Sequence, residues 1–352
     1  MTYTDGWAAI NLEMPARVPH TEYSVTEHWD VIKAVTGIDV GPFSPPEVRR
    51  RGSLALMEAW NFDFRWSTLI GGEELAACHT DMGHAEYAAG GVDRRDTVMC
   101  PFSTPEAVLS FDPWEVYGPR DQAELTRRFE EHYRRQREET PEQVTMTGVY
   151  VTLVSGLIDI FGWEMLLLAA GVDPKGFGDV ANRYASWIQQ HFNALGAADV
   201  PVVMVHDDIV WSAGPFISPR WYRQYVFPNY KKLFAPLLDS GKKIMYTSDG
   251  NYTCFIDDLA NCGVHGFVLE PWTDMAYIAE KYGRTHAFIG NADTRILLRG
   301  DKAAIRAEVE RCMAIGKACP GFFLAVGNHI PANTPVESVL YYNEVYEELS
   351  RR

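Results

Sequence analysis

The second half of the chain alternates short, almost wholly apolar runs with longer amphipathic segments. The apolar runs are rich in β-branched residues, as in VPVVMVHDDIV at 200–210, and each is followed by helix signals. Ser218 and Pro219 mark one helix start, and Gly241 marks its end. The pattern predicts strands at 200–210, 242–248, 264–269, 285–290 and 322–326, and helices at 218–241, 251–260, 273–282, 294–317 and 334–352.

Single residues refine these elements. Pro228 predicts a kink in the first of these helices, and Gly300 predicts a break in helix 294–317. Thr334 is expected to cap the last helix. Further upstream, the alternating aromatic residues at 60–66 predict a strand, and the charged segment 121–139 predicts a helix.

Apolar strands that alternate with helices are typical of a parallel sheet with helices on its faces. The chain has 352 residues and no G-x-G-x-x-G sequence at a strand–helix junction, which favours a closed barrel over an open doubly wound sheet. We therefore predict an α/β fold with a single domain at 1–352, a (β/α)8 TIM barrel. Residues 1–140 are expected to carry N-terminal extensions and the early barrel elements.

The charge balance and the apolar runs narrow the class of protein. The net charge is −15, with 47 acidic and 32 basic residues and no basic stripe, which argues against nucleic-acid binding. The start of the chain lacks a signal-peptide pattern, and the longest apolar run, Val149–Ile160, is shorter than a membrane span and interrupted by polar residues. None of the six cysteines forms a C-x-x-C pair. We expect a cytoplasmic protein with reduced thiols that binds no membrane.

Each late strand ends in polar residues. In a parallel barrel these ends converge on the face that carries the chemistry. They are His206, Asp207 and Asp208; Thr247, Ser248 and Asp249; Glu270; Asn291 and Asp293; and Asn328 and His329. Structural roles compete with function here, because Asp208 and Asp293 could cap helices, and Asp249-Gly250 is a common turn. Glu270 has no evident capping role, so it is the strongest candidate.

Two further groups are candidates for the site. His79, Asp81 and His84 lie close in sequence, but their spacing matches no reliable metal signature, so a structural or exposed position is the favoured interpretation for the two histidines. Trp211 and Trp272 follow strand ends and could line a pocket, as could aromatic residues elsewhere.

At these residues the chain resembles the uroporphyrinogen decarboxylase superfamily, which also holds corrinoid-linked methyltransferases. The resemblance covers most of the chain from residue 13 onward. It is carried by HDDIVWSAGPFISPRWYRQYVFPNYK, YTSDGN, FVLEPWTDM, GNADTRILLRG and AVGNHIPANTP. The order of these segments is specific for the superfamily and much less specific for a reaction.

Departures from the family patterns bear on the reaction. The decarboxylases resemble one another in an early arginine- and glycine-rich segment that grips carboxylates, whereas here PARVPHTEYS offers only Arg17. Asp81 falls near the position of their central aspartate. The zinc methyltransferases share a His-x-Cys-Gly segment and a later cysteine, but this chain has Thr247-Ser248-Asp249-Gly250 and, later, Asn328. A thiolate zinc site is therefore not expected, whereas an oxygen- and nitrogen-rich site remains open.

The resemblance implies a methyltransferase-like enzyme that acts on a small methylated compound and passes the methyl group to a corrinoid protein or another acceptor. The candidate catalytic residues are Glu270, His329, Asp208 and Asp249. The candidate substrate-binding residues are His206, Asp207, Asn291, Tyr150, Trp211, Trp272, Asp81 and Arg17. Zinc is the candidate metal, with His206, Asp249, Glu270 and His329 as ligands, and any corrinoid would arrive on a separate partner.

Two alternatives stay open at this point. One is decarboxylation of a porphyrinogen or of a smaller carboxylate, which would need cationic groups in the pocket. The other is a non-catalytic barrel that binds a tetrapyrrole or corrinoid. A homodimer is the expected assembly in either case.

Overall fold

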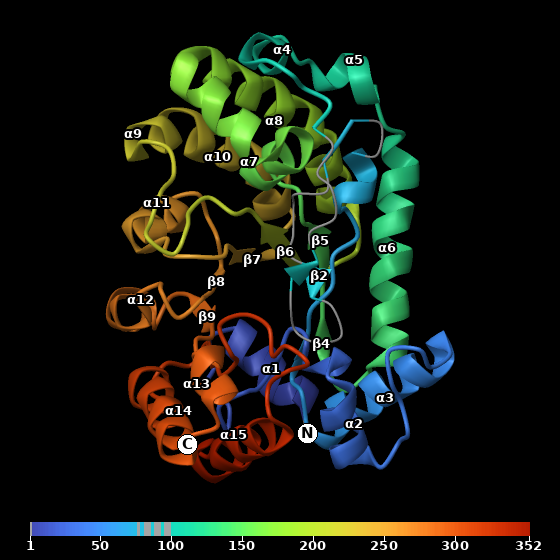
Figure 1. The fold of residues 1–352 in the computed structure, drawn as a ribbon, viewed down its shortest axis with the longest axis vertical. Coiled ribbons are helices and arrows are strands. Elements are labelled where there is room, and N and C mark those ends of the chain that lie inside the picture. The colour runs from blue at the N-terminus through green and yellow to red at the C-terminus, as the bar shows by residue number, and fades with distance from the viewer. Residues whose placement is uncertain (1, 76–77, 81–85, 88–92, 95–99) are drawn as a thin grey trace.

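A six-stranded parallel sheet forms the centre of the molecule in the computed structural model, which describes residues 2–75, 78–80, 86–87, 93–94 and 100–352 (Figure 1). The strand order is β10-β9-β8-β7-β6-β5, so strands that follow one another in the chain are neighbours. These strands are β5 (Thr147–Val149), β6 (Val202–His206), β7 (Lys243–Thr247), β8 (Gly266–Val268), β9 (Ala287–Ile289) and β10 (Phe322–Phe323). All five strands predicted from the second half of the sequence are present, each shorter than its apolar run.

The helices lie between the strands along the chain. They are α1 (Thr2–Ile10), α2 (Trp29–Thr36), α3 (Pro46–Ala59), α4 (Pro105–Leu109), α5 (Pro113–Tyr117), α6 (Gln122–Glu139), α7 (Val154–Val172), α8 (Pro174–Ala197), α9 (Pro219–Trp221), α10 (Phe227–Asp239), α11 (Ile256–Ala260), α12 (Met275–Tyr282), α13 (Thr294–Arg299), α14 (Lys302–Gly316) and α15 (Val336–Leu349). The shorter turns are η1 (Val25–Glu27), η2 (Gly72–Leu75), η3 (Tyr222–Val226) and η4 (Thr253–Phe255). The α8 helix packs against both α7 and α10 beside the sheet, whereas α14 and α15 pair near the chain ends (Figure 1).

Early segments flank the sheet and connect its two edges. β1 (Phe64–Arg65) pairs in parallel with β4 (Val144–Thr145), and Ile70 forms a parallel bridge with Val149 of β5. On the other side, the backbone amide of Leu324 donates to the carbonyl oxygen of Pro19 at 2.9 Å. The backbone amide of Asp63 donates to the carbonyl oxygen of His20, also at 2.9 Å. Segment 19–21 therefore lies between the β10 end and the β1 end. A (β/α)8 barrel requires these links, and its complete closure stays a prediction. A third pair, β2 (Glu86–Tyr87) and β3 (Asp93–Arg94), is antiparallel.

Of the three predictions made from single residues in the second half of the chain, the structure confirms two and contradicts one. The kink expected at Pro228 is present as the π-helical turn η3 between α9 and α10, and Gly300, with φ of 77°, separates α13 from α14. Thr334 does not cap the last helix. Pro335 occupies the N-cap position of α15 instead, so that prediction was wrong by one residue. The wrong position follows from the local sequence, because proline fits both the cap and the first turn.

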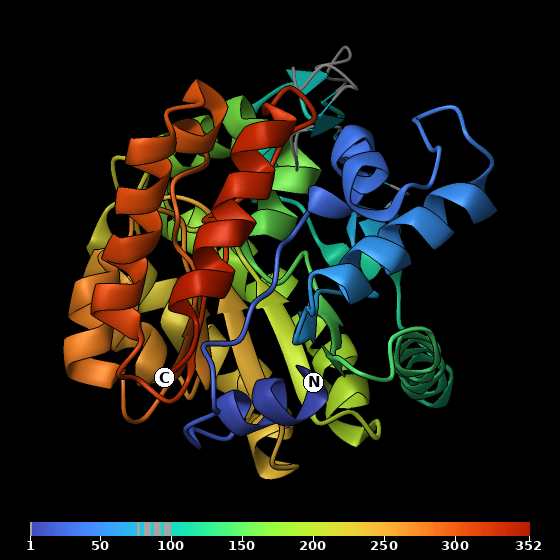
Figure 2. The same ribbon diagram turned by 90° about the horizontal axis from the view of Figure 1, so that it is seen from below.

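Strand residues alternate between two packed regions. Val203 and Val205 belong to the large core under the helices, whereas Val202 and Met204 belong to a smaller cluster on the opposite face of the sheet. The smaller cluster also contains Ala9 and Ile10 of α1. The His265 ring lies 2.5 Å from the carbonyl oxygen of Ile10, and α1 crosses beneath the strands (Figure 2). This arrangement leaves the carboxyl ends of the strands as the open end.

One helix of the described residues, α7, is long and apolar enough to cross a membrane by length and composition. Two thirds of its apolar window is buried against the rest of the protein, as in the core helix of a globular fold. In the sequence analysis the apolar run ends at Ile160. In the structure the apolar helix α7 continues beyond that residue to Val172. Gly162, with φ of 67°, interrupts its helical geometry.

Gly148 should be intolerant of any side chain. It lies in β5, and a Cβ atom there would overlap the carbonyl oxygen of Met204 on β6. We expect Gly148→Ala to lower the free energy of unfolding by about 1–3 kcal/mol, since overpacking against backbone forces the strands apart. Urea unfolding provides the measurement. Gly171→Ala on α7 is the control, because nothing lies within 4 Å of its Cβ position, and alanine there should be neutral or stabilising by up to about 1 kcal/mol.

Candidate active site

A cavity of about 370 Å³ opens at the carboxyl ends of the strands. Its volume falls in the range of small-molecule sites, roughly 300–1,000 Å³. The lining residues follow segment 19–21, β1, β5, β6, β7, β8 and β10 along the chain. They are Tyr23, Trp66, Ser67, Thr68, Tyr150, Met204, His206, Thr247, Ser248, Asp249, Val268, Glu270, Gly327, Asn328 and His329. The polar strand ends thus meet at one place, as the sequence predicts.

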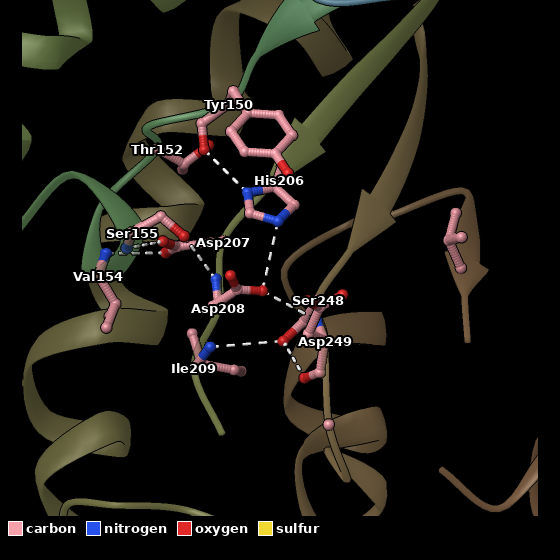
Figure 3. Close-up of polar contacts among 12 residues, drawn as sticks. Tyr150, Thr152, Val154, Ser155, His206, Asp207, Asp208, Ile209, Ser248 and Asp249 are labelled. Atoms are coloured by element: carbon pink, nitrogen blue, oxygen red, sulfur yellow. Dashed lines mark hydrogen bonds and ion pairs between the residues drawn. The ribbon is translucent and has the colours of Figure 1, made fainter. Parts of the chain in front are cut away.

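His206 at the end of β6 is held on three sides (Figure 3). Its Nδ1 lies 3.0 Å from the carbonyl oxygen of Tyr150, and its Nε2 lies 3.3 Å from Oδ1 of Asp208. The Tyr150 ring stacks on the imidazole with centroids 3.7 Å apart and an angle of 7°. Burial lowers the pKa of His206, but the Asp208 charge and hydrogen bond outweigh it and raise the pKa to about 9. His206 is therefore a cation at neutral pH, paired with Asp208.

Glu270 is fixed in place by two donors. The amide of Gly250 donates to its Oε2 at 2.6 Å, and the side-chain amide of Asn328 donates to its Oε1. Burial raises the pKa of Glu270 and the charge of Asp208 adds to that effect, against the opposing hydrogen bonds from Asn328 and Gly250. Both donors come from neighbouring strand ends, so the carboxyl group is oriented before any ligand arrives.

Asp249 faces the same cavity. Asp249 is exposed at the cavity wall, and its backbone amide donates to Oδ1 of Asp208 at 2.8 Å. Burial, followed by the charges of Asp208 and Glu270, raises the pKa of Asp249 well above its usual range. The carboxyl groups of Asp208, Asp249 and Glu270 therefore share a small volume with one imidazolium, which favours a negative electrostatic potential in the site.

An aromatic wall completes the cavity. The rings of Tyr23 and Trp66 stack with centroids 4.2 Å apart and an angle of 11°. The Trp66 indole nitrogen is buried without a hydrogen-bond partner in the described part of the chain. The Tyr23 and Thr247 hydroxyls are buried beside each other: burial raises the pKa of Tyr23 well above its usual value, and the hydrogen bond from Thr247 opposes that rise. Burying an unpaired donor is costly, so a ligand or water that reached these atoms would be stabilised.

Asp207 lies behind the cavity and has a structural role. Its carboxylate accepts hydrogen bonds from the amides of Val154 at 3.0 Å and Ser155 at 2.6 Å, at the start of α7, and from the Tyr230 hydroxyl. The Ser155 hydroxyl in turn accepts from the amide of Asp208 at 2.7 Å (Figure 3). Asp207 therefore connects β6 to the helices that follow β5 and β6.

Most of the predicted site residues line the cavity or support it from behind. His206, Asp249, Glu270, His329 and Tyr150 line the cavity, and Asp208 contacts two of them. Asp207 and Asn291 support it from behind, since the Asn291 amide donates to the carbonyl oxygen of Glu270 at 3.2 Å. Burial lowers the pKa of His329, which favours the neutral ring.

The remaining predicted residues lie elsewhere. Trp211 packs on Trp163 and Phe216, and Trp272 lies under Arg295 at 4.2 Å, so neither lines the cavity. The Arg17 side chain pairs with Asp63 at 2.7 Å, and its backbone forms an antiparallel β-bridge with Arg351, away from the lining residues. His79 is exposed, as the sequence favours. Asp81 and His84 lie outside the described residues.

Several lining residues escaped the sequence-based list. Tyr23 and Trp66 come from the first 140 residues, whose strands are two residues long or single bridges and leave almost no periodic signal. Asn328 and Thr247 appear among the polar strand ends but carry no distinctive motif. Their position beside Glu270 and Asp249 depends on the strand register, which a single sequence does not show.

The side chains of the cavity do not form a metal-binding cluster in the described part of the chain. Within the described ranges, no group of three or more His, Cys, Asp or Glu side chains is close enough to hold a metal ion. Both Glu270 oxygens already accept hydrogen bonds, and Asp208 accepts from the Asp249 amide. The described residues as placed do not fit the predicted zinc site.

Comparisons with known proteins decide the family. The family model described as uroporphyrinogen decarboxylase (URO-D) matches residues 94–349. The chain belongs to the uroporphyrinogen decarboxylase family. Uroporphyrinogen decarboxylase of Thermus thermophilus is 27% identical over 161 residues, which are 46% of this chain and 45% of that protein. The Carboxydothermus hydrogenoformans protein of the same name is 26% identical over 177 residues, 50% and 49% of the two chains. The alignments thus span about half the length of these curated relatives.

A solved structure supports the fold over nearly the whole chain. A methyltransferase from Methanosarcina mazei superposes with a TM-score of 0.65 at 19% identity and covers 98% of both chains. The family match and this superposition together show a URO-D-like α/β fold.

Asp159 gives the site region a pH-dependent stability. It is buried on α7, and burial raises its pKa to about 7, with His206 opposing and Asp208 adding to the rise. Because its folded pKa exceeds the unfolded value of about 3.9, its contribution to stability is full at low pH and is lost as pH rises through 7. We expect wild type to lose stability relative to Asp159→Asn between pH 5 and pH 8, by at most about 1.4 kcal/mol per pH unit. Urea midpoints at both pH values measure this. Parallel curves, like those expected for exposed Asp179→Asn, would contradict it.

Proposed function

We propose that this protein is a methyltransferase-like enzyme that removes a methyl group from a small compound bound at the strand ends. The observation that carries the proposal is the charge of the cavity. Its described lining contains Asp249, Glu270 and His206 but no arginine or lysine. A porphyrinogen carries several carboxylates and needs matching cations in its binding site. The carboxylates of this cavity wall would repel those of a porphyrinogen.

The arginine that acts on Glu270 is already paired with another carboxylate. Arg295 acts on Glu270 electrostatically, but its guanidinium pairs with both carboxylate oxygens of Asp293, at 2.6 Å and 2.8 Å, and lies over Trp272. The Asp293 carboxylate therefore offsets most of the positive charge that Arg295 could present to the cavity. Arg17, a candidate substrate-binding residue from the sequence, pairs with Asp63 instead.

Glu270 is the residue best placed to contact the methyl-bearing group. Gly250 and Asn328 orient it, and its carboxyl group can act as an anion toward a cationic substrate or as a proton donor toward a neutral leaving group. His206 and Asp208 form a fixed ion pair that orients the Tyr150 ring. His329, a neutral ring on the opposite strand end, completes the polar wall.

The proposal includes the partners that this reaction requires. A methyl group leaving the substrate must go to a nucleophile, and a corrinoid carried on a separate protein, or another acceptor, would supply it. We also propose that segment 19–21 closes the sheet into a (β/α)8 barrel in a cytoplasmic, homodimeric enzyme. The backbone links from Pro19 to Leu324 and from His20 to Asp63 support the closure.

Decarboxylation is the second candidate function. The family and the curated relatives carry that activity in their names, and burial, which raises the pKa of Asp249 and of Glu270, favours the protonated forms that could protonate a carbanion. A smaller carboxylate would suit the electronegative cavity better than a porphyrinogen, since it presents fewer negative charges.

The test is methyl transfer to cob(I)alamin from a panel of small methylated ethers, amines, sulfides and onium compounds, followed by absorbance. We expect wild type to form methylcobalamin with at least one donor. Glu270→Gln should reduce kcat/KM by about 100-fold or more, because the charge and the acid are both lost. Glu280→Gln, an exposed change on α12, is the matched control. Equal rates for wild type and Glu270→Gln would exclude the proposed role of this residue.

A further inference from the structure

The cavity places aromatic faces and carboxylates around one small volume. Tyr23 and Trp66 form a stacked pair on one part of the wall, and Asp249 and Glu270 lie at the ends of β7 and β8 on another. We propose that the cavity binds a small compound whose methyl groups sit on a positively charged nitrogen or sulfur, a quaternary ammonium or sulfonium compound. This inference rests on the proposed function and specifies its substrate class.

The aromatic part of the wall suits such a methylated cation. Quaternary ammonium groups are held against aromatic rings by attraction to the ring quadrupole, about 0.5–2 kcal/mol per contact. Trp66 is the strongest ring for this purpose. The stacking with Tyr23 and an edge contact with Phe64, with centroids 5.1 Å apart, hold it in place, so little entropy is lost on binding.

The carboxylates supply the opposite charge. Asp208, Asp249 and Glu270 together face a single cation, His206, and Arg295 is committed to Asp293. An arriving onium group would relieve the mutual repulsion of the carboxylates, which an uncharged compound of the same shape cannot do. Charge, rather than shape alone, should therefore determine affinity.

An independent feature points to a ligand with a polar tail. The Trp66 indole nitrogen, on a lining residue, is buried with no partner among the described residues. The Tyr23 and Thr247 hydroxyls interact with each other in the same lining, so they leave one donor between them. These two donors can bind an oxygen atom of a ligand. A methylated onium compound that carries a hydroxyl or carboxylate group would satisfy the aromatic wall, the carboxylates and these donors together.

The transfer step is balanced without a proton. The bond between the methyl carbon and the onium nitrogen or sulfur breaks, and its electron pair remains on that atom, which leaves a neutral tertiary amine or a thioether. The acceptor, a Co(I) corrinoid or another soft nucleophile on the partner, supplies the electron pair for the new bond to carbon. For this class Glu270 acts by its charge and need not donate a proton.

Calorimetry on the full chain tests this with matched probes. Choline and 3,3-dimethylbutan-1-ol have the same shape and differ in the charge of the head group, as do glycine betaine and 3,3-dimethylbutanoate. We expect at least one onium probe to bind 10-fold or more tightly than its uncharged-head counterpart. Trp66→Leu and Glu270→Gln should each reduce that ratio at least 5-fold. Trp114→Leu, at a half-exposed tryptophan on α5 outside the lining, should leave it unchanged.

The outcomes separate this inference from the proposed function. If neither onium probe is preferred, the substrate class is wrong, and methyl transfer from a neutral donor would show that the proposed function survives. If an onium probe is preferred in wild type and in both cavity variants alike, its site is not this cavity, and the inference fails. Onium preference that depends on Trp66 and Glu270, without methyl transfer from any donor, would uphold the cation site and refute the methyltransferase.

Discussion

The site depends on one buried carboxylate. Asp207 accepts the amide hydrogens at the start of α7 and the hydroxyl of Tyr230 on α10, so it connects the end of β6 to both helices. Charge-assisted hydrogen bonds of this kind contribute about 1.5–3 kcal/mol each. With Asp207 fixed, the residues on either side of it in the chain are fixed too, and His206 meets the Tyr150 ring while Asp208 meets the Asp249 amide.

The same geometry creates an electrostatic conflict. Asp208, Asp249 and Glu270 crowd one face, and burial raises the pKa of both Asp249 and Glu270 beyond the effect of the local hydrogen bonds. A fold would not retain such repulsion for stability alone, because uncharged residues would pack there at lower cost. The conflict is relieved by a cation or by protonation, and this property distinguishes the cavity from one built for a polycarboxylate.

The sequence predicted the late strands and their polar ends because apolar runs of β-branched residues between helix signals are strong local patterns. Glu270 was recognisable because a carboxylate between a buried strand and Pro271 has no capping role. The aromatic wall was not predictable, since Tyr23 and Trp66 follow segments too short to show periodicity. Trp211 and Trp272 follow strand ends as expected, yet their rings turn toward Trp163 and Arg295, a packing choice that local sequence does not encode.

The central claim is that this cavity excludes polycarboxylates and accepts a small methylated compound. The most direct measurement is the rate at which the purified wild-type protein converts uroporphyrinogen III to decarboxylated products, followed by chromatography of the oxidised porphyrins. The account predicts no product above the uncatalysed background at any pH between 6 and 8. Turnover to coproporphyrinogen at enzymatic rates would contradict it and would assign this chain the reaction named for its family.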